Sequence, residues 1–358
     1  MMKIVLTGGG TGGHVYPALA VAEQILAKFD AEIFYYGTEY GPERAIAEQN
    51  GFTYRTIPAS QVRGKSPIRI ITGLVNLWRG TRKAQKNLKK DQPNVVFATG
   101  GYVAAPVGRA AKNCKIPLIV FQPDIYPGWA IKFLTRYATS IACTSEKSLK
   151  YLPVHKAKVT GYPIRKQFLE ATETKGKTNF ALIDNLPTLL VSGGSLGSHS
   201  INEIISKSLS QLLLNMQIIH ITGASDFRKI SIHKSKLSPI EQHRYHVLEY
   251  TNDIANAMAA SQLTVTRAGA SILGELPSLG LPAIVIPGNF SDQLNNANLL
   301  GEKNAASIIS ENELHNLPSL IIEILSNSER QQSMANNMKN LYTPNATDKI
   351  IKLLMEVV

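Results

Sequence analysis

The chain has 358 residues, of which 44% are hydrophobic, so we expect a globular protein with two α/β domains of about 150 residues each rather than a disordered chain. The net charge of +12 favours an anionic partner: a nucleic acid, an acidic membrane face or a phosphorylated substrate. Cys114 and Cys143 are too few for a disulfide framework, and the N-terminal apolar stretch is too short for a signal peptide or a membrane span. These features predict a cytoplasmic protein.

Short apolar runs alternate with helix-length segments along the chain. Because such runs are typical of parallel strands that are buried on both faces, they predict an α/β fold with two doubly wound, Rossmann-like domains. The predicted strands are Lys3–Thr7, Glu32–Tyr36, Val95–Ala98, Pro117–Phe121 and Ser140–Cys143 in the first half, and Thr188–Ser192, Gln217–Ile221, His246–Glu249, Leu263–Thr266 and Ala283–Ile286 in the second.

Two stretches separate these series of strands: Gly161-Tyr162-Pro163 and the polar, lysine-containing Glu170–Asn179, where we expect the linker. The pattern is helical beyond Glu311, and the amphipathic segment Thr347–Val357 is expected to pack back on the first domain. The predicted parts of the chain are residues 1–162, residues 163–342 and a C-terminal helix in residues 343–358.

The run Gly8-Gly9-Gly10-Thr11-Gly12-Gly13-His14 lies between a predicted strand and a helix that we expect Pro17 to open. Glycines allow positive φ and close approach of a ligand, and the helix N-terminus offers N–H groups to a phosphate or a sugar oxyanion. The run also satisfies Gly-x-Gly-x-x-Gly, with Glu39 roughly where a ribose-binding acid would fall. A dinucleotide-binding dehydrogenase is therefore one interpretation of this loop.

A second glycine-rich run, Ser192-Gly193-Gly194-Ser195-Leu196-Gly197-Ser198, follows another predicted strand and precedes a helix that runs on from Ser200. A two-domain dehydrogenase needs only one such loop. Two loops favour a ligand held between domains, with a diphosphate near one helix N-terminus and an acceptor near the other. Either loop alone could be only a tight turn between a strand and a helix.

Several motifs in combination resemble the MurG family of glycosyltransferases and span nearly the whole chain. They are Gly9-Gly10-Thr11-Gly12-Gly13-His14, Gly100-Gly101-Tyr102-Val103, Gly193-Gly194-Ser195-x-Gly197, Arg267-x-Gly269-Ala270 with Glu275, Gly280-Leu281-Pro282-Ala283, and Gln293-x-x-Asn296-Ala297. The resemblance implies the GT-B fold, in which two Rossmann-like domains face each other across a cleft. It also implies an inverting, family 28 type enzyme that moves N-acetylglucosamine from UDP-N-acetylglucosamine to the 4-hydroxyl of the muramyl sugar of lipid I, an undecaprenyl-diphosphate-linked muramyl peptide. The product would be lipid II of peptidoglycan synthesis.

The resemblance further implies that residues 1–162 bind the acceptor and the membrane, and that residues 163–342 bind the donor. Ser195 would contact the donor diphosphate, Arg165 would make a further contact in the donor site, and Thr251 would lie beside the uracil. Glu275 would bind the ribose, since its two oxygens can accept from both hydroxyls. The full set implied for substrate binding is Thr11, Gly12, Gly13, Asp124, Arg165, Ser195, Thr251, Ala270, Ser271, Glu275, Asp292 and Gln293, the last two for the transferred sugar.

One segment departs from the family pattern. Many members have His-Glu-Gln-Asn after the fifth strand, whereas this chain has Phe121-Gln122-Pro123-Asp124. The asparagine that contacts the donor in the family thus becomes Asp124, and a neighbouring acid becomes Gln122. Donor specificity or the identity of the base can differ as a result.

Inverting transfer needs a base for the acceptor hydroxyl and stabilisation of the departing UDP. His14 is the first candidate because imidazole titrates near neutrality, but it could instead only hydrogen-bond loop backbone or an acceptor phosphate. Asp124 is the second candidate, although beside Pro123 it could be a turn or capping residue. Glu275 and Arg267 could form a structural ion pair. Without an Asp-x-Asp dyad or His-rich spacing, we expect neither a metal ion nor a cofactor.

No acidic residue occurs from Gln49 to Lys90, where basic residues accumulate. Apolar residues at helical spacing form one stripe that can pack on the domain and a second stripe with no evident partner, so we expect this helix to bind an anionic membrane surface. An ordinary surface helix is the alternative, and nucleic acid is not expected because no recognised module is present. The expected membrane contacts are Ile71, Leu74, Val75, Trp78, Arg79, Arg82 and Lys83.

The sequence therefore predicts a peripheral enzyme on the cytoplasmic face of the cell membrane. Three other functions fit parts of the pattern. They are a UDP-sugar transferase with a different glycolipid acceptor, a sugar-nucleotide epimerase, and a non-catalytic sensor or scaffold that binds a UDP-sugar at the membrane.

Overall fold

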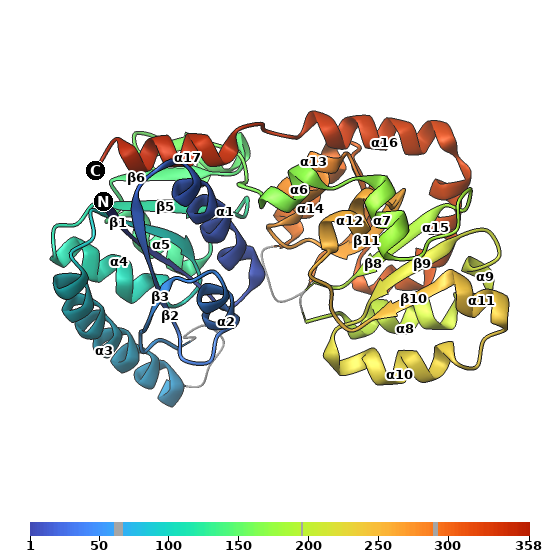
Figure 1. Cartoon of the computed structure of the whole chain (residues 1–358), viewed down its shortest axis with the longest axis horizontal. Helices are drawn as coiled ribbons and strands as arrows, with labels where there is room; N and C mark the ends of the chain where they lie inside the picture. The colour runs from blue at the N-terminus through green and yellow to red at the C-terminus, as the bar shows by residue number, and fades with distance from the viewer. Residues whose placement is uncertain (61–66, 195, 289–292) are drawn as a thin grey trace. The chain divides into compact units, whose positions relative to one another are not determined.

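The computed structural model describes residues 1–60, 67–194, 196–288 and 293–358, without the side chains of residues 67–72 and 74. The chain divides into two compact units (Figure 1). Unit 1 comprises Met1–Arg165 and Thr343–Val358, and unit 2 comprises Lys166–Tyr342. The roles predicted for the two domains, in binding acceptor and donor, stay predictions.

Unit 1 is built on a seven-stranded sheet with the order β3-β2-β1-β4-β5-β6-β7, in which all described pairs are parallel. Helix α4 packs against both α3 and α5, whereas α1 packs against α2 and α17 (Figure 1). The strands are β1 (Met2–Gly8), β2 (Ala31–Gly37), β3 (Thr53–Thr56), β4 (Val95–Gly100), β5 (Leu118–Gln122), β6 (Ser140–Cys143) and β7 (Ala157–Val159). The helices are α1 (Gly12–Lys28), α2 (Pro42–Gln49), α3 (Pro67–Asp91), α4 (Ala104–Asn113), α5 (Trp129–Thr135), the 3-10 helix η1 (Glu146–Tyr151) and α17 (Ala346–Met355).

The central strands of unit 1 are buried on both faces. Val5 and Val96 belong to the core that includes residues of α3, α4 and α5, while their neighbours Ile4 and Phe97 are also fully buried. Successive side chains of a strand point to opposite faces, so both faces of the sheet are covered. This accounts for the continuous apolar runs from which the strands were predicted.

Unit 2 is built on a six-stranded sheet with the order β10-β9-β8-β11-β12-β13, again with parallel pairs. The predicted class of two parallel-sheet α/β domains is thus confirmed. The strands are β8 (Thr188–Ser192), β9 (Gln217–Ile221), β10 (Tyr245–Leu248), β11 (Leu263–Arg267), β12 (Ala283–Ile286) and β13 (Ala306–Ile308). The helices are α6 (Lys166–Glu170), α7 (Glu173–Asn179), α8 (His199–Lys207), α9 (Leu209–Leu212), α10 (Ala224–Lys234), α11 (Pro239–Arg244), α12 (Ile254–Ala259), α13 (Ile272–Leu279), α14 (Gln293–Glu302), the 3-10 helix η2 (Glu311–Asn316), α15 (Leu317–Ser326) and α16 (Ser328–Asn340).

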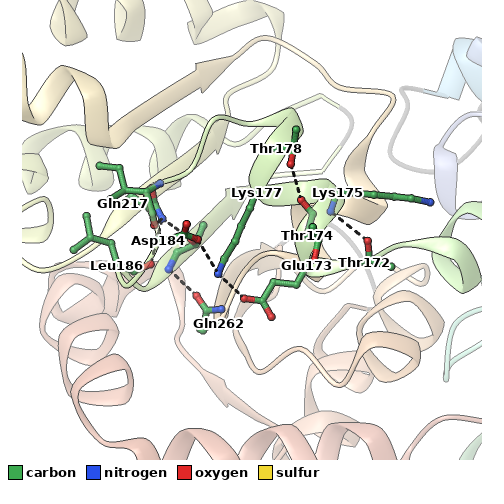
Figure 2. Close-up of polar contacts among 12 residues, drawn as sticks. Thr172, Glu173, Thr174, Lys175, Lys177, Thr178, Asp184, Leu186, Gln217 and Gln262 are labelled. Carbon is green, nitrogen blue, oxygen red and sulfur yellow. Dashed lines mark hydrogen bonds and ion pairs between the residues drawn. The ribbon is translucent and has the colours of Figure 1, made fainter.

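The sequence suggested that the polar stretch Glu170–Asn179 is a linker. The structure corrects this, because the stretch is part of unit 2. Thr172 caps helix α7 by accepting from the N–H of Lys175, and Lys177 forms ion pairs with Glu173 and Asp184 (Figure 2). Its lysines therefore belong to a short capped helix, which composition alone does not distinguish from a loop.

Pro17 lies inside α1 and does not open it, because the helix already begins at Gly12. A proline cannot donate to the carbonyl four residues earlier, which here is that of Gly13. The hydroxyl of Tyr162 donates to that carbonyl oxygen over 3.4 Å. The side chain of Tyr162 thus satisfies the carbonyl oxygen that has no hydrogen bond from the proline.

Helix α17 returns to unit 1 at the end of the chain. Asp348 accepts from Gln24 of α1 over 2.6 Å and forms an ion pair with Lys28, also of α1. Glu356 forms an ion pair with Lys158 of β7. Polar contacts therefore hold both ends of this helix against the rest of unit 1.

Candidate active site

Three loops of unit 1 follow the neighbouring strands β1, β4 and β5, at the carboxyl edge of the sheet. The loops of residues 8–14 and 100–103 approach through their backbones, since a Cβ at Gly101 would lie 2.1 Å from the carbonyl oxygen of Gly9. Gly100 and Gly101 also have φ of 111° and 76°, which residues with side chains rarely adopt. Both the close approach and the backbone conformation require glycine here.

His14, the last residue of the first loop, has a defined ring orientation. Its Nδ1 lies 2.9 Å from the carbonyl oxygen of Thr99, and a Cβ at Gly100 would lie 2.8 Å from the same nitrogen. Because a carbonyl only accepts, Nδ1 carries the hydrogen, and in the neutral imidazole the lone pair is then on Nε2. His14 thus hydrogen-bonds backbone, which was one alternative from the sequence, and still keeps a basic nitrogen.

The divergent segment of residues 121–124 forms a turn at the end of β5. The buried Gln122 donates from its side-chain nitrogen to the backbone oxygen of Asp124 over 2.6 Å, and the hydroxyl of Thr144 donates to the carbonyl of the intervening proline over 2.8 Å. The Asp124 side chain is half-buried. Since β4 lies between β1 and β5, the structure brings His14 and Asp124 to the same edge of the sheet.

The other site residues predicted in unit 1 lie around α1. Thr11 is its N-cap, and Gly12 and Gly13 are its first residues. The guanidinium of Arg165 lies over the ring of Tyr16, 3.9 Å from the ring centroid. This cation–π contact fixes Arg165 on the helix that begins with the first glycine-rich loop.

The second glycine-rich loop follows β8 and is held by its backbone. Gly194 and Gly197 have φ of 88° and 77°, and the N–H of Gly197 donates to the carbonyl of Gly194 over 3.0 Å. A Cβ at Gly197 would lie 2.0 Å from the carbonyl oxygen of Thr222, in the turn after β9. Ser195 lies outside the described residues, so its contact with a diphosphate stays a prediction.

A buried polar network supports the turn against which this loop packs. Asn202 donates to the carbonyl of Thr222 and to Asp226, and its oxygen lies 2.9 Å from Nε2 of His220. Nδ1 of His220 lies 2.7 Å from the hydroxyl of Tyr245. Burial lowers the pKa of His220 to about 3, so the ring is neutral, donating to Asn202 and accepting from Tyr245.

Arg267, at the carboxyl end of β11, connects the second loop to the rest of unit 2. It donates to the hydroxyls of Ser198 and Ser200 over 2.7 and 3.2 Å. The same guanidinium forms an ion pair with Glu311 of η2, a partner that the sequence did not suggest. A cation therefore lies beside the N-terminus of α8, directly after the loop.

The residues predicted to bind the nucleotide and the transferred sugar lie on three further elements of unit 2. Glu275 is buried in the first turn of α13, and Ala270 and Ser271 precede that helix. The hydroxyl of Thr251 accepts from a backbone N–H two residues later, and Oε1 of Gln293 accepts from the N–H of Gly288 over 2.8 Å. Their predicted neighbour at position 292 lies outside the described residues. Over the part of the chain that the structure describes, no group of three or more His, Cys, Asp or Glu side chains could hold a metal ion.

Comparison with known proteins identifies the family. The N-terminal domain of glycosyltransferase family 28 matches residues 4–143, and the C-terminal domain of the same family matches residues 188–350. Two curated relatives, from Roseiflexus sp. (strain RS-1) and Halothermothrix orenii, are each 35% identical to the chain. The matches cover 100% and 99% of the chain and 95% and 98% of the relatives, and both are named UDP-N-acetylglucosamine--N-acetylmuramyl-(pentapeptide) pyrophosphoryl-undecaprenol N-acetylglucosamine transferase. The chain belongs to the MurG family.

Solved structures agree on the fold of this MurG-family chain. MurG of Acinetobacter baumannii has a TM-score of 0.77 at 24% identity, covering 99% of the chain and 100% of that structure. A UDP-GlcNAc 2-epimerase from Neisseria meningitidis, bound to UDP-GlcNAc, has a TM-score of 0.71 at 16% identity, with 99% and 100% covered. At such identities the likeness shows the fold alone. The predicted glycosyltransferase class rests on the family models and on the relatives named above, and they confirm it.

Helix α3 of this glycosyltransferase presents apolar and basic side chains on its described surface. Val75 and Trp78 are exposed, and the guanidinium of Arg82 lies 3.9 Å from the centroid of the Trp78 ring. Arg79 and Lys83 are exposed on the same stretch. The side chains of two further predicted contacts, at positions 71 and 74, lie outside the described residues. Among the described helices, none has the length and apolar composition needed to cross a membrane.

The main feature that sequence reasoning missed is the orientation of His14 by Thr99. These residues are separated by 85 positions, and only the pairing of β1 with β4 brings them together. A histidine at the end of a glycine-rich loop indicates a candidate base. It does not indicate which nitrogen carries the lone pair.

Proposed function

We propose that the chain transfers N-acetylglucosamine from UDP-N-acetylglucosamine to the 4-hydroxyl of the muramyl sugar of lipid I, on the cytoplasmic face of the cell membrane. Full-length similarity to relatives named for this transfer supports the substrates. The observation that carries the mechanism is the contact between Nδ1 of His14 and the carbonyl of Thr99, because it leaves a basic nitrogen at the carboxyl edge of the sheet.

In this mechanism His14 is the general base. Its Nε2 takes the proton of the acceptor hydroxyl as the hydroxyl oxygen attacks the anomeric carbon of the donor sugar. The bond from that carbon to the diphosphate breaks, and UDP leaves with the electron pair. A positioned base of this kind contributes about 10²- to 10⁴-fold to the rate.

Residues of unit 2 would bind the donor. Ser195 and the N-terminus of α8 would meet the charge that grows on the diphosphate, since a helix N-terminus offers N–H groups to anions. Glu275 would accept from the ribose hydroxyls, and Thr251 would lie beside the uracil. Gln293, with its oxygen held by a backbone N–H, would read a sugar hydroxyl through its amide N–H groups. Asp292 would be its neighbour in that role, and Arg165 would add a contact to the donor.

A transferase with a different glycolipid acceptor is the second candidate. The observation that favours it is the turn at residues 121–124, where the hydrogen bond from Gln122 holds the backbone of Asp124. A carboxylate then lies at the edge of the sheet where we place the acceptor, at the position where the family has an amide. A non-catalytic UDP-sugar sensor would use the same donor contacts but would produce no turnover.

The decisive test is to incubate the purified protein with UDP-N-acetylglucosamine and a short-chain lipid I analogue, and to measure UDP release and the glycosylated lipid by mass spectrometry. We expect both products in equal amounts. Binding of the donor without transfer to lipid I would contradict the proposal. A control reaction without lipid acceptor distinguishes the transferase from an epimerase, because an epimerase would change the donor sugar even without the lipid.

Helix α3 would hold the enzyme at the membrane. Each basic residue near anionic lipid contributes roughly 1 kcal/mol, and each well-buried large apolar side chain about 1.5–3 kcal/mol. The variant Val75→Asp/Trp78→Asp should therefore lose most of its binding to anionic liposomes. The matched control is Ile240→Asp, which changes an exposed apolar residue on helix α11 of unit 2. Equal liposome binding by the two variants would contradict this role of α3.

A further inference from the structure

Glu43, in the first turn of α2, is a buried carboxylate to which the proposed mechanism gives no role. Its relative exposure is 0%. Oε1 accepts from the N–H and the hydroxyl of Thr38 over 2.9 and 2.6 Å, and Oε2 accepts from the N–H of Gly10 over 3.4 Å. Burial of a carboxylate is costly unless hydrogen bonds compensate it, and here the donors come from two separate segments. Glu43 therefore connects the first glycine-rich loop to the segment after β2.

Glycines make the space that this carboxylate occupies. A Cβ at Gly41 would lie 2.2 Å from both carboxylate oxygens, and a Cβ at Gly9 would lie 2.6 Å from Oε1 of Glu43. At Gly37, a Cβ would lie 2.7 Å from Cγ of the same side chain. Gly41 has φ of −79°, which any residue adopts, so its backbone does not require glycine. The contact with Glu43 is what excludes a side chain at this position.

The position of Glu43 changes what the first loop can offer to a ligand. The N–H of Gly10 is directed to Glu43, so it is not among the groups that bind a substrate anion. The same loop ends at His14, whose ring is fixed from the other side by Thr99. The loop is thus attached at Gly10 to α2 and at His14 to β4, and both attachments determine where Nε2 of His14 lies.

We propose that Glu43 is a positioning residue for glycosyl transfer. Through Gly10 it holds the first glycine-rich loop in the conformation that places His14 against the acceptor hydroxyl. This inference rests on the proposed function, in which His14 is the base. Glu43 itself touches no substrate, because it is fully buried.

The first test compares Glu43→Ala and Glu43→Gln with the natural protein. Alanine removes both oxygens that accept from Thr38 and Gly10, and glutamine replaces one of them with an N–H group that faces a donor. Both variants should therefore displace the loop. A misplacement of about 1 Å can lower a rate about 10²-fold, and we expect kcat to fall by between roughly 10- and 100-fold. The dissociation constant for UDP should stay within about twofold, because the residues proposed to hold the diphosphate, ribose and uracil, namely Ser195, Glu275 and Thr251, belong to unit 2. The control is Glu48→Gln, on the same helix, which changes an exposed ion pair with Arg44 and should leave kcat unchanged.

The second test uses the dependence of Gly41 on Glu43. In the natural protein, Gly41→Ala should displace the carboxylate and lower kcat roughly tenfold, within the coupling range of residues in contact. In the Glu43→Ala background, the same change should alter kcat by less than about twofold, because the three atoms nearest to the new Cβ, all of Glu43, are then absent. Gly128→Ala is the matched control, since a Cβ at Gly128 would meet no atom within 4 Å. Equal effects of Gly41→Ala in both backgrounds would overturn the proposal.

Hydrogen exchange measured by mass spectrometry reports how well the amides of the first loop are protected, and it does not depend on glycosyl transfer. In the Glu43 variants, exchange of the amides of residues 8–15 should accelerate at least tenfold, while residues 196–207 of unit 2 exchange as before. If all variants transfer sugar at the natural rate and exchange is unchanged, Glu43 has no positioning role. If the natural protein makes no glycosylated lipid, the proposed function fails. Accelerated exchange in the Glu43 variants would then still support the conclusion that Glu43 fixes the first loop, and unchanged exchange would contradict that conclusion.

Discussion

The two glycine-rich loops have side chains of opposite charge as their supports. In unit 1, the buried carboxylate of Glu43 accepts from the backbone of the first loop. In unit 2, the guanidinium of Arg267 donates to Ser198 at the end of the second loop and to Ser200 in the first turn of α8. Both loops lie between a strand and a helix, and sequence patterns describe them in the same terms. Their supports differ in the sign of their charge, and the roles proposed for the loops differ as well: the first holds His14, the proposed base, and the second would receive the anionic diphosphate.

Under the proposed function, this difference would explain why two similar loops serve different substrates. A guanidinium beside a helix N-terminus strengthens binding of an anion, and the carboxylate of Glu311 that pairs with Arg267 reduces this effect. An anion beneath a loop occupies an N–H group that could otherwise bind a phosphate, and its charge disfavours a second anion nearby. We therefore expect that substitutions of the two supporting residues, Glu43 and Arg267, change different kinetic quantities. The first loop should affect turnover, and the second should affect donor affinity.

The largest expected effect is that of His14→Ala. Removal of the general base should lower kcat about 10²- to 10⁴-fold while the dissociation constant for UDP changes little. His155→Ala is the control, because it changes an exposed histidine of the same unit. A steady-state assay of UDP release with the lipid I analogue gives both quantities. An unchanged kcat would remove His14 from the role of base and would leave the first loop without a catalytic group.

Arg267→Ala should give the next largest effect, on the donor side. Arg267 holds Ser198 and Ser200 at the helix N-terminus that we propose to bind the diphosphate. A hydrogen bond to a charged group contributes about 1.5–3 kcal/mol, so loss of one such contact with the diphosphate, through displacement of this N-terminus, should weaken UDP binding roughly 10- to 100-fold. Arg330→Ala, which breaks the exposed ion pair with Glu323, is the control. Isothermal titration with UDP measures the affinity directly. Natural affinity in Arg267→Ala would show that the support of the second loop does not serve the nucleotide.

The sequence predicted the central strands and the glycine-rich loops but missed their supports. Ten apolar runs gave nine strands in the interior of the sheets and the partly exposed edge strand β10, with boundaries that differ by a few residues at most. The strands that were not predicted, β3, β7 and β13, all lie at sheet edges and are partly exposed. Edge strands need no continuous apolar run, so the pattern on which the prediction depended is absent from them.

The supports of the loops could not be predicted because each depends on residues that are distant in sequence. Glu43 is 33 positions from Gly10, and Arg267 is 69 positions from Ser198. Nothing in the local sequence of α2 indicates that an acid in its first turn is buried, since acids are common at that place for their effect on the helix dipole. The strand order of each sheet decides which loops become neighbours, and that order is not visible in local patterns.

The two units should also respond differently to acid. Burial lowers the pKa of His220 to about 3, below its ordinary value of 6.5, so the unfolded chain binds a proton more readily than unit 2 does. The stabilisation is complete above pH 6.5 and is lost as the pH falls from 6.5 towards 3, by about 2 kcal/mol at pH 5 for this one residue. Burial also lowers the pKa of His246 to about 4, with the same sign.

Unit 1 has a carboxylate that loses its stabilising effect only at lower pH. Although burial alone would raise the pKa of Asp91, hydrogen bonds from Arg55 and Tyr36 hold it below its ordinary value of 3.8. Its contribution is therefore complete above about pH 4 and is lost only as the pH falls further. Both tryptophans, Trp78 and Trp129, belong to unit 1, so their fluorescence reports on that unit alone. During acid titration, circular dichroism should begin to change at higher pH than tryptophan fluorescence, and coincident transitions would contradict this difference between the units.

The smallest effect is expected for Asp124→Asn, and it sharpens the assignment of the base. The backbone of this turn is held by Gln122, and an amide keeps the size of the side chain while removing its charge. With the lone pair of His14 in place, kcat should fall less than about tenfold, well below the loss expected for removal of a general base. A loss of kcat as large as that of His14→Ala would instead assign proton removal to Asp124.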